Sequence, residues 1–252
     1  MKLTIVGMSG SYPGPDSAAS CYLVEQEHEG RTHRLVLDLG SGALGQLQRY
    51  TRLDEIDAVL LSHLHADHCL DLCGFYVVRR YYCEKSLPRV PVYGPRGTAG
   101  RLARAYGLPL HPGMTTEFDF RSYPDGRFSL GPFSIRRTRV RHPVPAYAVR
   151  IEAGGSSLVY SGDTGACGSL VRLAAGCDLF LCEGSFVESA DNPPDLHMTG
   201  KEAAEHASRA GVGRLVLTHI PPTVDQMEVL ADAKPAYAGP LDVARPGATY
   251  TL

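Results

Sequence analysis

The chain of 252 residues lacks several features that would place it in a specialised class of protein. Its apolar runs are short, and none approaches the roughly 18 residues needed to span a bilayer. The first run, in MKLTIVGMSG, stops at Gly7 without a signal-peptide core. The formal net charge is only −2, so no strong overall field attracts nucleic acid or a membrane surface. We therefore expect a cytoplasmic protein without a membrane partner.

Paired cysteines are also missing. The seven cysteines are odd in number and form no C-x-x-C motif, which excludes a disulfide scaffold. Most of them sit in apolar runs, where a free thiol packs as a small hydrophobe. Cys69 and Cys73 share a predicted helix face beside a histidine-rich motif. We interpret both as core residues, with metal contact as the alternative.

The sequence does contain strand-like and helix-like segments that alternate along its whole length, without internal repeats. Two strand-rich halves, each with helices to cover it, predict a four-layer αββα sandwich of the α/β class, with residues 1–252 in one domain. The expected strands are Leu3–Val6, Ser20–Glu25, Arg34–Leu39, Ala58–Ser62, Val90–Tyr93, Glu117–Tyr123, Arg127–Leu130, Phe133–Arg141, Tyr147–Glu152, Ser157–Tyr160, Leu179–Cys182 and Arg214–Thr218. The expected helices are Leu70–Tyr82, Thr98–Tyr106, Ser169–Ala175 and Gly200–Ala210, followed by one more helix and a final strand.

The segment LSHLHADH holds the densest group of metal-binding residue types in the chain: His63, His65, Asp67 and His68. Imidazole and carboxylate groups are the usual ligands of zinc, and they also suit manganese and iron. Such groups are costly to gather beside an apolar strand unless something charged pairs with them. A turn after His65 would let the four side chains surround two adjacent points. The alternative is a solvent-exposed polar loop.

Three further polar residues each follow a predicted strand. His142 ends FSIRRTRVRH, Asp163 lies in the turn SGDTG after SSLVYS, and His219 ends RLVLTH. Each one alone is more often structural, but strand ends can converge at one edge of a sheet. Together with the histidine-rich segment they predict a metal site.

The order His63-x-His65-x-Asp67-His68, then His142, Asp163 and His219, resembles the metallo-β-lactamase superfamily over essentially the whole chain. The resemblance implies an αββα sandwich with two divalent metal ions at its open edge. It assigns His63, His65 and His142 to the first metal, and Asp67, His68 and His219 to the second. Asp163 would bridge the two. Zinc is the expected metal, with manganese or iron as alternatives.

Other segments of the sequence resemble particular groups within this superfamily. HMTGKEAAEHASRAGVGRLVLTH resembles the tRNase Z group, in which the residue matching His197 is assigned as a proton donor; a polar loop residue before a helix is the alternative. That group carries a long arm that grips tRNA between the ligands matching His142 and Asp163. Here only twenty residues separate the two, so tRNA processing is disfavoured.

The text MKLTIVGMSGSYPGPDSAASCYLVE, with LVLDLGSGALGQLQRY and LSHLHADHCLDLCGFYVVRRYY, resembles a group of actinobacterial hydrolases described as atypical class II cyclic-nucleotide phosphodiesterases. The resemblance implies hydrolysis of a 3′,5′-cyclic nucleotide such as cAMP to the 5′-monophosphate by a metal-bridging hydroxide, with Asp67 and His197 as catalytic residues. An RNA 3′-processing nuclease of the tRNase Z kind, and a lactone or thioester hydrolase, are the alternatives. The expected partner is a small phosphodiester rather than extended nucleic acid. Relatives in the tRNase Z branch often dimerise, so a homodimer is also an expectation.

Basic residues near these motifs are ambiguous. Along the predicted strand that His142 ends, Arg137, Arg139 and Arg141 share the face opposite His142 and are expected to point away from the metal. We interpret them, with Arg136, as a solvated strand face, and contact with a phosphate backbone is the alternative. Arg79 and Arg80, on the helix after the histidine-rich motif, are open to the same two readings.

Overall fold

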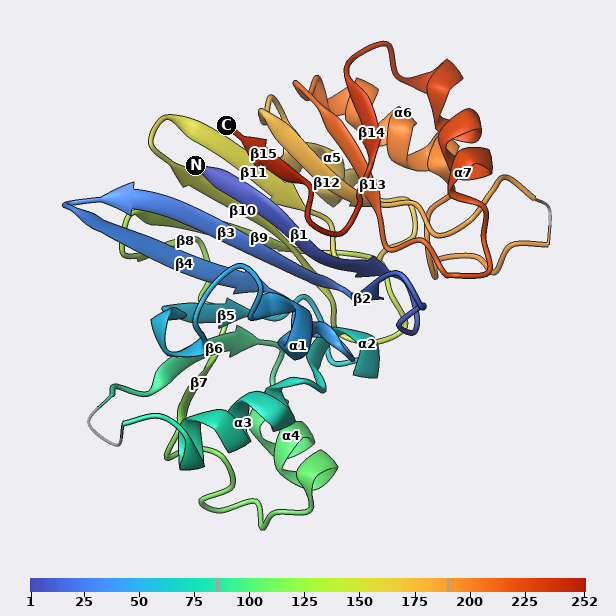
Figure 1. Cartoon of the computed structure of the whole chain (residues 1–252). Helices are drawn as coiled ribbons and strands as arrows, with labels where there is room; N and C mark the ends of the chain where they lie inside the picture. Colours follow the sequence, from blue (N-terminus) through green and yellow to red (C-terminus); the bar gives the residue numbers. More distant parts are fainter. Residues whose placement is uncertain (85–86, 190) are drawn as a thin grey trace.

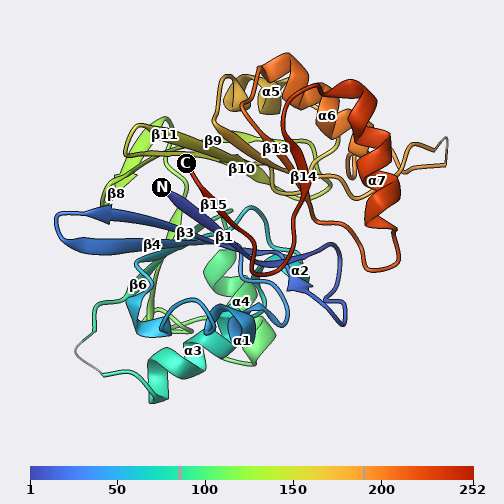
Figure 2. The same ribbon diagram turned by 45° about the horizontal axis from the view of Figure 1, so that its top comes forward.

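Two β-sheets packed face to face form the centre of the protein, with helices on both outer faces (Figure 1). The computed structural model describes residues 1–84, 87–189 and 191–252. Helices α1, α3 and α4 lie outside the first sheet, and α5, α6 and α7 lie outside the second, as both views show (Figure 2). The four-layer αββα arrangement predicted from the sequence is therefore confirmed.

The first sheet has the order β15-β1-β3-β4-β5-β6-β7, with the short β2 paired to β1. Its strands and covering elements are β1 (Lys2–Ser9), β2 (Ala18–Ala19), β3 (Cys21–His28), β4 (Arg31–Leu37), α1 (Ala43–Leu47), β5 (Ala58–Leu60), α2 (Ala66–Cys69), α3 (Leu72–Tyr81), β6 (Val90–Gly94), α4 (Thr98–Tyr106), β7 (Phe118–Ser122) and β15 (Thr249–Thr251).

The second sheet has the order β14-β13-β12-β11-β10-β9-β8. Its elements are β8 (Arg127–Leu130), β9 (Phe133–Arg139), β10 (Tyr147–Ala153), β11 (Ser156–Tyr160), α5 (Gly168–Ala174), β12 (Leu179–Glu183), α6 (Gly200–Ala210), β13 (Leu215–Thr218), α7 (Gln226–Ala233) and β14 (Leu241–Val243). No helix within the described ranges is long and apolar enough to cross a membrane.

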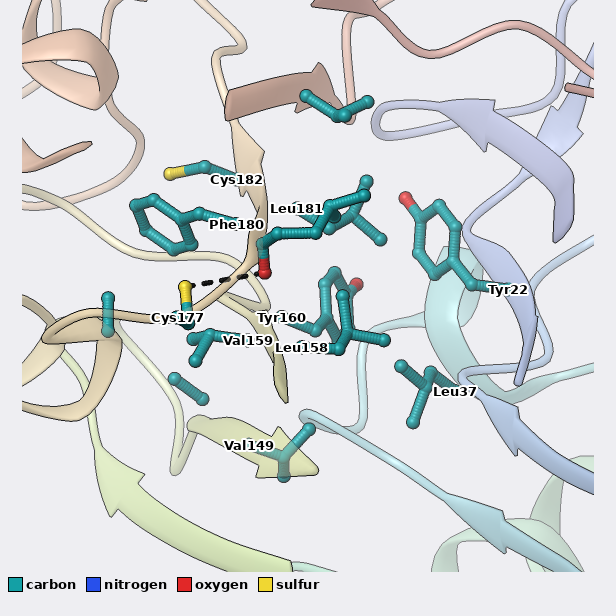
Figure 3. Packing of buried hydrophobic residues seen from close by; sticks show 14 of the residues in the cluster. Tyr22, Leu37, Val149, Leu158, Val159, Tyr160, Cys177, Phe180, Leu181 and Cys182 are labelled. Carbon is teal, nitrogen blue, oxygen red and sulfur yellow. Dashed lines mark hydrogen bonds between the residues drawn. The ribbon is translucent and has the colours of Figure 1, made fainter. Parts of the chain in front are cut away.

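Side chains from both sheets meet in one apolar layer (Figure 3). Leu37 and Tyr22 enter it from the first sheet, and Leu158, Tyr160 and Leu181 enter it from the second. The rings of Tyr22 and Tyr160 have centroids 5.0 Å apart, so aromatic contact joins the sheets close to their site-bearing edge. Burial of this layer is the main force holding the sandwich together.

The carboxyl ends of several parallel strands gather at that edge. In the first sheet β4 runs parallel to β5, and in the second β11, β12 and β13 are mutually parallel. Neighbouring parallel strands end side by side, so the residues that follow them are brought together. This arrangement places the histidine-rich segment opposite the loops that follow β11 and β13.

Several local features differ from the sequence expectations. The helix expected over Leu70–Tyr82 begins at Leu72, because residues 66–69 form the separate short helix α2. The five-residue α1 was not predicted, since so short a helix carries little periodic signal. The tail after α7 forms two strands, β14 and β15, rather than one; β15 pairs with β1, which brings the two termini side by side.

Candidate metal centre

The residues of the histidine-rich segment turn towards one another because the chain changes from strand to helix inside the motif. His65 has an extended backbone and immediately precedes α2. Asp67 and His68 then lie on the helix, which confirms the turn expected after His65. Both are buried, as is His63. The local fold therefore points four polar side chains inward from one short segment.

One group of side chains lies around His65 Nδ1. His63 Nε2 is 3.0 Å from this atom and His142 Nε2 is 3.2 Å from it. Asp163 completes the group, whose possible ligand atoms all lie within 4.8 Å of one another. Imidazole nitrogens that converge at such distances are typical of a shared metal ion.

A second group lies beside the first. His68 Nε2 is 3.1 Å from His219 Nε2, and His219 Nε2 is 3.2 Å from Asp67 Oδ2. Asp163 belongs here too. Its Oδ2 faces His63 at 3.5 Å, whereas its Oδ1 lies 3.2 Å from His68 Nε2. One carboxylate therefore turns one oxygen to each group, which is the geometry of a bridging ligand.

The chemistry of this donor set fits divalent cations. Asp163 is only 2 % exposed, and its Oδ1 accepts no well-aligned hydrogen bond among the described residues, although the rings of His68 and His219 lie 3.2 and 3.4 Å away. A buried carboxylate oxygen left in this way is strongly unfavourable unless a cation pairs with it. The structure thus brings all seven ligands expected from the sequence into one buried cluster that is suited to divalent metal.

The pKa values of three histidines and of Asp163 favour the protonation states that ligands need, whereas in the metal-free cluster Asp163 and Asp38 outweigh burial and raise the pKa of His68. Burial lowers the pKa of His63, His65 and His142, which keeps these imidazoles neutral with a free lone pair. Burial alone would raise the pKa of Asp163, but His219 and His68 outweigh it and hold the pKa well below its usual range. The carboxylate is therefore ionised.

Hydrogen bonds to the second ring nitrogen orient most of these imidazoles. Each bond engages Nδ1 and leaves Nε2 directed at the cluster. The partners are Asp38 Oδ2 for His68 at 2.7 Å, Ser62 Oγ for His63 at 3.0 Å, the Leu196 carbonyl for His142 at 3.0 Å and Ser185 Oγ for His219 at 3.0 Å. His65 differs, because its Nδ1 is the atom that faces the cluster.

Asp38 is a site residue that sequence reasoning missed. It is fully buried after β4, with a left-handed φ of 54°. Its carboxylate accepts from the Ser62 N–H at 2.6 Å and from the Tyr160 hydroxyl at 2.7 Å, as well as from His68. The available signal was the same as for Asp163, namely an acidic residue directly after an apolar strand, LVLD.

Glu183, the last residue of β12, is the second missed residue. It is fully buried, and its Oε1 lies 3.0 Å from His197 Nδ1. Burial would lower the pKa of His197, but the Glu183 carboxylate outweighs it and raises this pKa to about 9. The His197 ring lies 5.3 Å from that of His219 and 5.6 Å from that of His142. A protonated imidazole is thus held at the margin of the cluster.

The basic residues do not form one exposed strip. β9 ends at Arg139, so the expected alternation through residue 142 is wrong. Arg137 follows Ile135 on the inner face, where it stacks over Tyr147 and pairs with Asp125. Arg136 pairs with Glu152, and Arg141 pairs with Asp195.

The remaining candidates have partners within the fold. Arg80 pairs with Glu117 and Arg79 donates to the Pro88 carbonyl. Cys69 is fully buried in an apolar cluster, and Cys73 packs against the same cluster. Neither cysteine joins a metal-binding group within the described part of the chain, so the interpretation as core residues is supported.

The comparisons with known proteins agree with this geometry. Residues 33–220 match the family model of the β-lactamase superfamily domain. The chain belongs to this superfamily. It is 44 % identical to an uncharacterized protein of Mycobacterium leprae, over 100 % of this chain and 89 % of that protein. It is 32 % identical to a ribonuclease Z of Mycolicibacterium gilvum, over 89 % of this chain and 85 % of that enzyme.

A probable metallo-hydrolase of Bacillus subtilis, YhfI, is 29 % identical over 98 % of both chains. Its crystal structure superposes with a TM-score of 0.87 and covers 99 % of each chain. The metallo-β-lactamase fold is therefore established for this superfamily member, and the chain is a metal-dependent hydrolase.

Proposed function

We propose that the protein is a dinuclear phosphodiesterase that hydrolyses a 3′,5′-cyclic nucleotide, such as cAMP, to the 5′-monophosphate. The position of Asp163 between two groups of side chains carries the proposal. His63, His65 and His142 would hold one cation, and Asp67, His68 and His219 would hold the other. Zinc is the expected ion, because its common ligands are those present. Two such ions supply an activated water and neutralise charge on the phosphoryl oxygens.

The chain's own residues supply the proton chemistry. In the hydrolysis a water oxygen bonds to phosphorus and the bond from phosphorus to the 3′ oxygen breaks. His197 is oriented by Glu183 and lies beside both groups, so it is placed to donate a proton to the departing 3′ oxygen. Asp67, buried next to His219, is placed to orient the attacking water as well as to bind metal.

Two observations support a small substrate. The segment between His142 and Asp163 contains only the hairpin of β10 and β11, which Gly154 and Gly155 connect. It therefore offers no protruding arm with which to hold a folded RNA. The slightly negative net charge also gives no general attraction for a polyanion.

An RNA 3′-end nuclease is the second candidate, and the identity to a ribonuclease Z favours it. A thioester hydrolase would use the same cluster without needing His197 as a proton donor, because a thiolate leaves unprotonated, whereas a lactone hydrolase would still have to protonate an alkoxide.

The first experiment is a product assay with metal-loaded protein and 3′,5′-cAMP. We expect conversion to 5′-AMP that is abolished by a chelator and by Asp163→Ala. Asp54→Ala, the same change at a surface residue paired with Arg52, should leave the rate unchanged. Formation of 3′-AMP, or no turnover by protein of verified metal content, would contradict the proposal. Cleavage of a precursor tRNA but not of cAMP would establish the nuclease instead.

A further inference from the structure

A cavity adjoins the metal-binding cluster on the side of His197. It has a volume of about 310 Å³, near the lower end of the 300–1,000 Å³ range typical of small-ligand sites. Its wall includes His197, Phe186, Arg141, Glu188 and Asn192. It therefore opens from the residue that we place beside the scissile bond.

The cavity and the cluster share their supporting contacts. The carbonyl of Leu196 orients His142 Nδ1, while Asp195, one residue earlier, pairs with Arg141 at 2.9 Å. Gly165, another lining residue, lies so close to Asp195 that an added Cβ would come within 2.7 Å of its Cα. The wall is thus a close-packed feature, fixed by the same loop that positions a proposed ligand.

Phe186 provides an apolar surface in this cavity. Its ring contacts that of His197 edge-on, with centroids 5.3 Å apart and planes at 85°. Its backbone is held between the Met198 carbonyl, to which its N–H donates, and the Gly200 N–H, from which its carbonyl accepts. Pro193 and Pro194 add apolar surface to the lining. A planar aromatic group could stack here next to the cluster.

Two side chains of the cavity lining, Glu188 and Asn192, offer hydrogen-bond acceptors. Glu188 is exposed at its margin; its only close partners in the described ranges are the Lys201 ammonium at 3.7 Å and the Thr199 hydroxyl at 3.5 Å. The Asn192 side chain donates to the Val187 carbonyl, which directs its amide nitrogen away and leaves its oxygen as an acceptor. Arg141, a cation on the same wall, is already paired with Asp195, so these acceptors favour an uncharged group rich in N–H and O–H donors.

We infer that this cavity is the subsite for the nucleoside part of the substrate, with Phe186 stacking on the base and Glu188 accepting a hydrogen bond from it or from the ribose. The inference rests on the proposed function and extends it, because it makes the enzyme select nucleotides over other phosphodiesters. Phe186 and Glu188 are then specificity residues, and the cations act only on the phosphate.

Binding of adenosine, measured by equilibrium dialysis, tests the subsite without any turnover. Adenosine has no phosphate, so its affinity reports the cavity rather than the cations. We expect Phe186→Ala to weaken binding at least tenfold, Phe186→Leu to weaken it less because bulk is kept, and Glu188→Gln to weaken it several-fold. Glu205→Gln, an exposed position on α6 outside the cavity, is the matched control and should bind as the parent does.

A kinetic comparison separates this inference from the proposed function. For each variant the kcat/KM for cAMP is divided by that for bis(4-nitrophenyl) phosphate, which carries no nucleoside. We expect the ratio to fall at least tenfold in Phe186→Ala. If cAMP is hydrolysed but neither the ratio nor adenosine binding changes in any variant, the subsite is wrong and the function stands. If adenosine binds through Phe186 but cAMP is not hydrolysed, the subsite stands and the function is wrong.

Discussion

Asp38 orients the candidate centre although it contributes no ligand to it. Its carboxylate accepts from His68, Ser62 and Tyr160, all of which are buried. The bond to His68 fixes the tautomer in which Nε2 is free for metal. Because Tyr160 belongs to the second sheet, the same carboxylate also links the two sheets beneath the site.

Asp38→Asn should weaken metal binding about 10- to 100-fold, the usual effect of losing the hydrogen-bonding partner of a metal-binding histidine. The amide keeps the shape of the side chain but presents N–H groups to donors. Affinity is measured by competition with a chromogenic chelator. Asp57→Asn, at a half-buried loop carboxylate that accepts from the Arg34 N–H far from the cluster, is the control. Equal affinities in the two variants would show that Asp38 has only a structural role.

Tyr160→Phe should destabilise the fold by about 1–3 kcal/mol, because one donor to the buried Asp38 carboxylate is lost while the ring packing is kept. Urea unfolding of metal-free protein provides the measurement. Comparison with Tyr237→Phe, which loses a bond to a neutral carbonyl of Val212, isolates the contribution of the charge. A smaller loss at Tyr160 than at Tyr237 would contradict this account.

His197→Ala separates the proton-donor role from a structural one. For cAMP, whose leaving group is a poor alkoxide, we expect the rate to fall about 10²- to 10⁴-fold. For bis(4-nitrophenyl) phosphate, whose leaving group needs no proton, the fall should be less than about tenfold, since general-acid catalysis is not required. Glu183→Gln should show the same pattern more weakly. If the rate fell equally for both substrates, His197 would not be the proton donor.

At the scale of the element, the start of helix α6 helps to position the proposed proton donor His197. Thr199 caps this helix, and the capping box with Glu202 is complete. The cap lies two residues after His197, so the start of the helix also fixes the approach of the loop. Gly200 packs against the backbone of α7, where an added Cβ would come within 2.3 Å of the Val229 carbonyl oxygen.

Thr199→Ala should cost about 1 kcal/mol of stability, in the range of 0.5–2 kcal/mol found for lost N-caps. Chemical unfolding measures the loss, with Glu205→Ala in the exposed middle of the same helix as the control. If the two variants unfold at the same denaturant concentration, the capping box contributes nothing here.

Strands and helices with strong periodicity were predictable from the sequence, and their ends were less so. Thr98–Tyr106 and Gly200–Ala210 were predicted with the observed bounds, because glycine and capping residues mark both ends. The two strands of the tail depend on partners distant in sequence, and short strands carry little signal of their own. β9 was predicted to continue through Arg141, and that error placed Arg137 on the wrong face.

The candidate site was predictable where its residues are clustered or follow strands in a recognised order. Asp38 and Glu183 also lie at the ends of apolar strands. A single acidic residue in the sequence, however, does not indicate which histidine it will contact. These contacts join residues distant in sequence: Asp38 and His68 are 30 residues apart, and Glu183 and His197 are 14 apart. Packing of the two sheets determines them, and the sequence alone does not show that packing.

At the scale of the whole molecule, the cluster joins the two sheets. His63 and His65 follow β5 of the first sheet, whereas Asp163 and His219 follow β11 and β13 of the second. A cation held between them would link the two layers through strong bonds at their open edge. Binding to the folded state alone stabilises it by about 4 kcal/mol when free metal exceeds the dissociation constant a thousandfold.

Removal of metal should therefore lower the melting temperature by roughly 10 °C, since 1 kcal/mol shifts it by about 2–4 °C in a chain of this size. Scanning calorimetry with and without a chelator measures the shift, and elemental analysis verifies metal content in both samples. Asp163→Asn should lose most of the chelator-dependent shift, whatever its own melting temperature, because the carboxylate facing both groups is gone. Asp54→Asn should retain the full shift. An unchanged melting temperature in the parent protein after verified loss of metal would mean that the cluster does not hold the sheets together through a cation. The apolar layer around Tyr22 and Tyr160 would then account for the stability of that edge by itself.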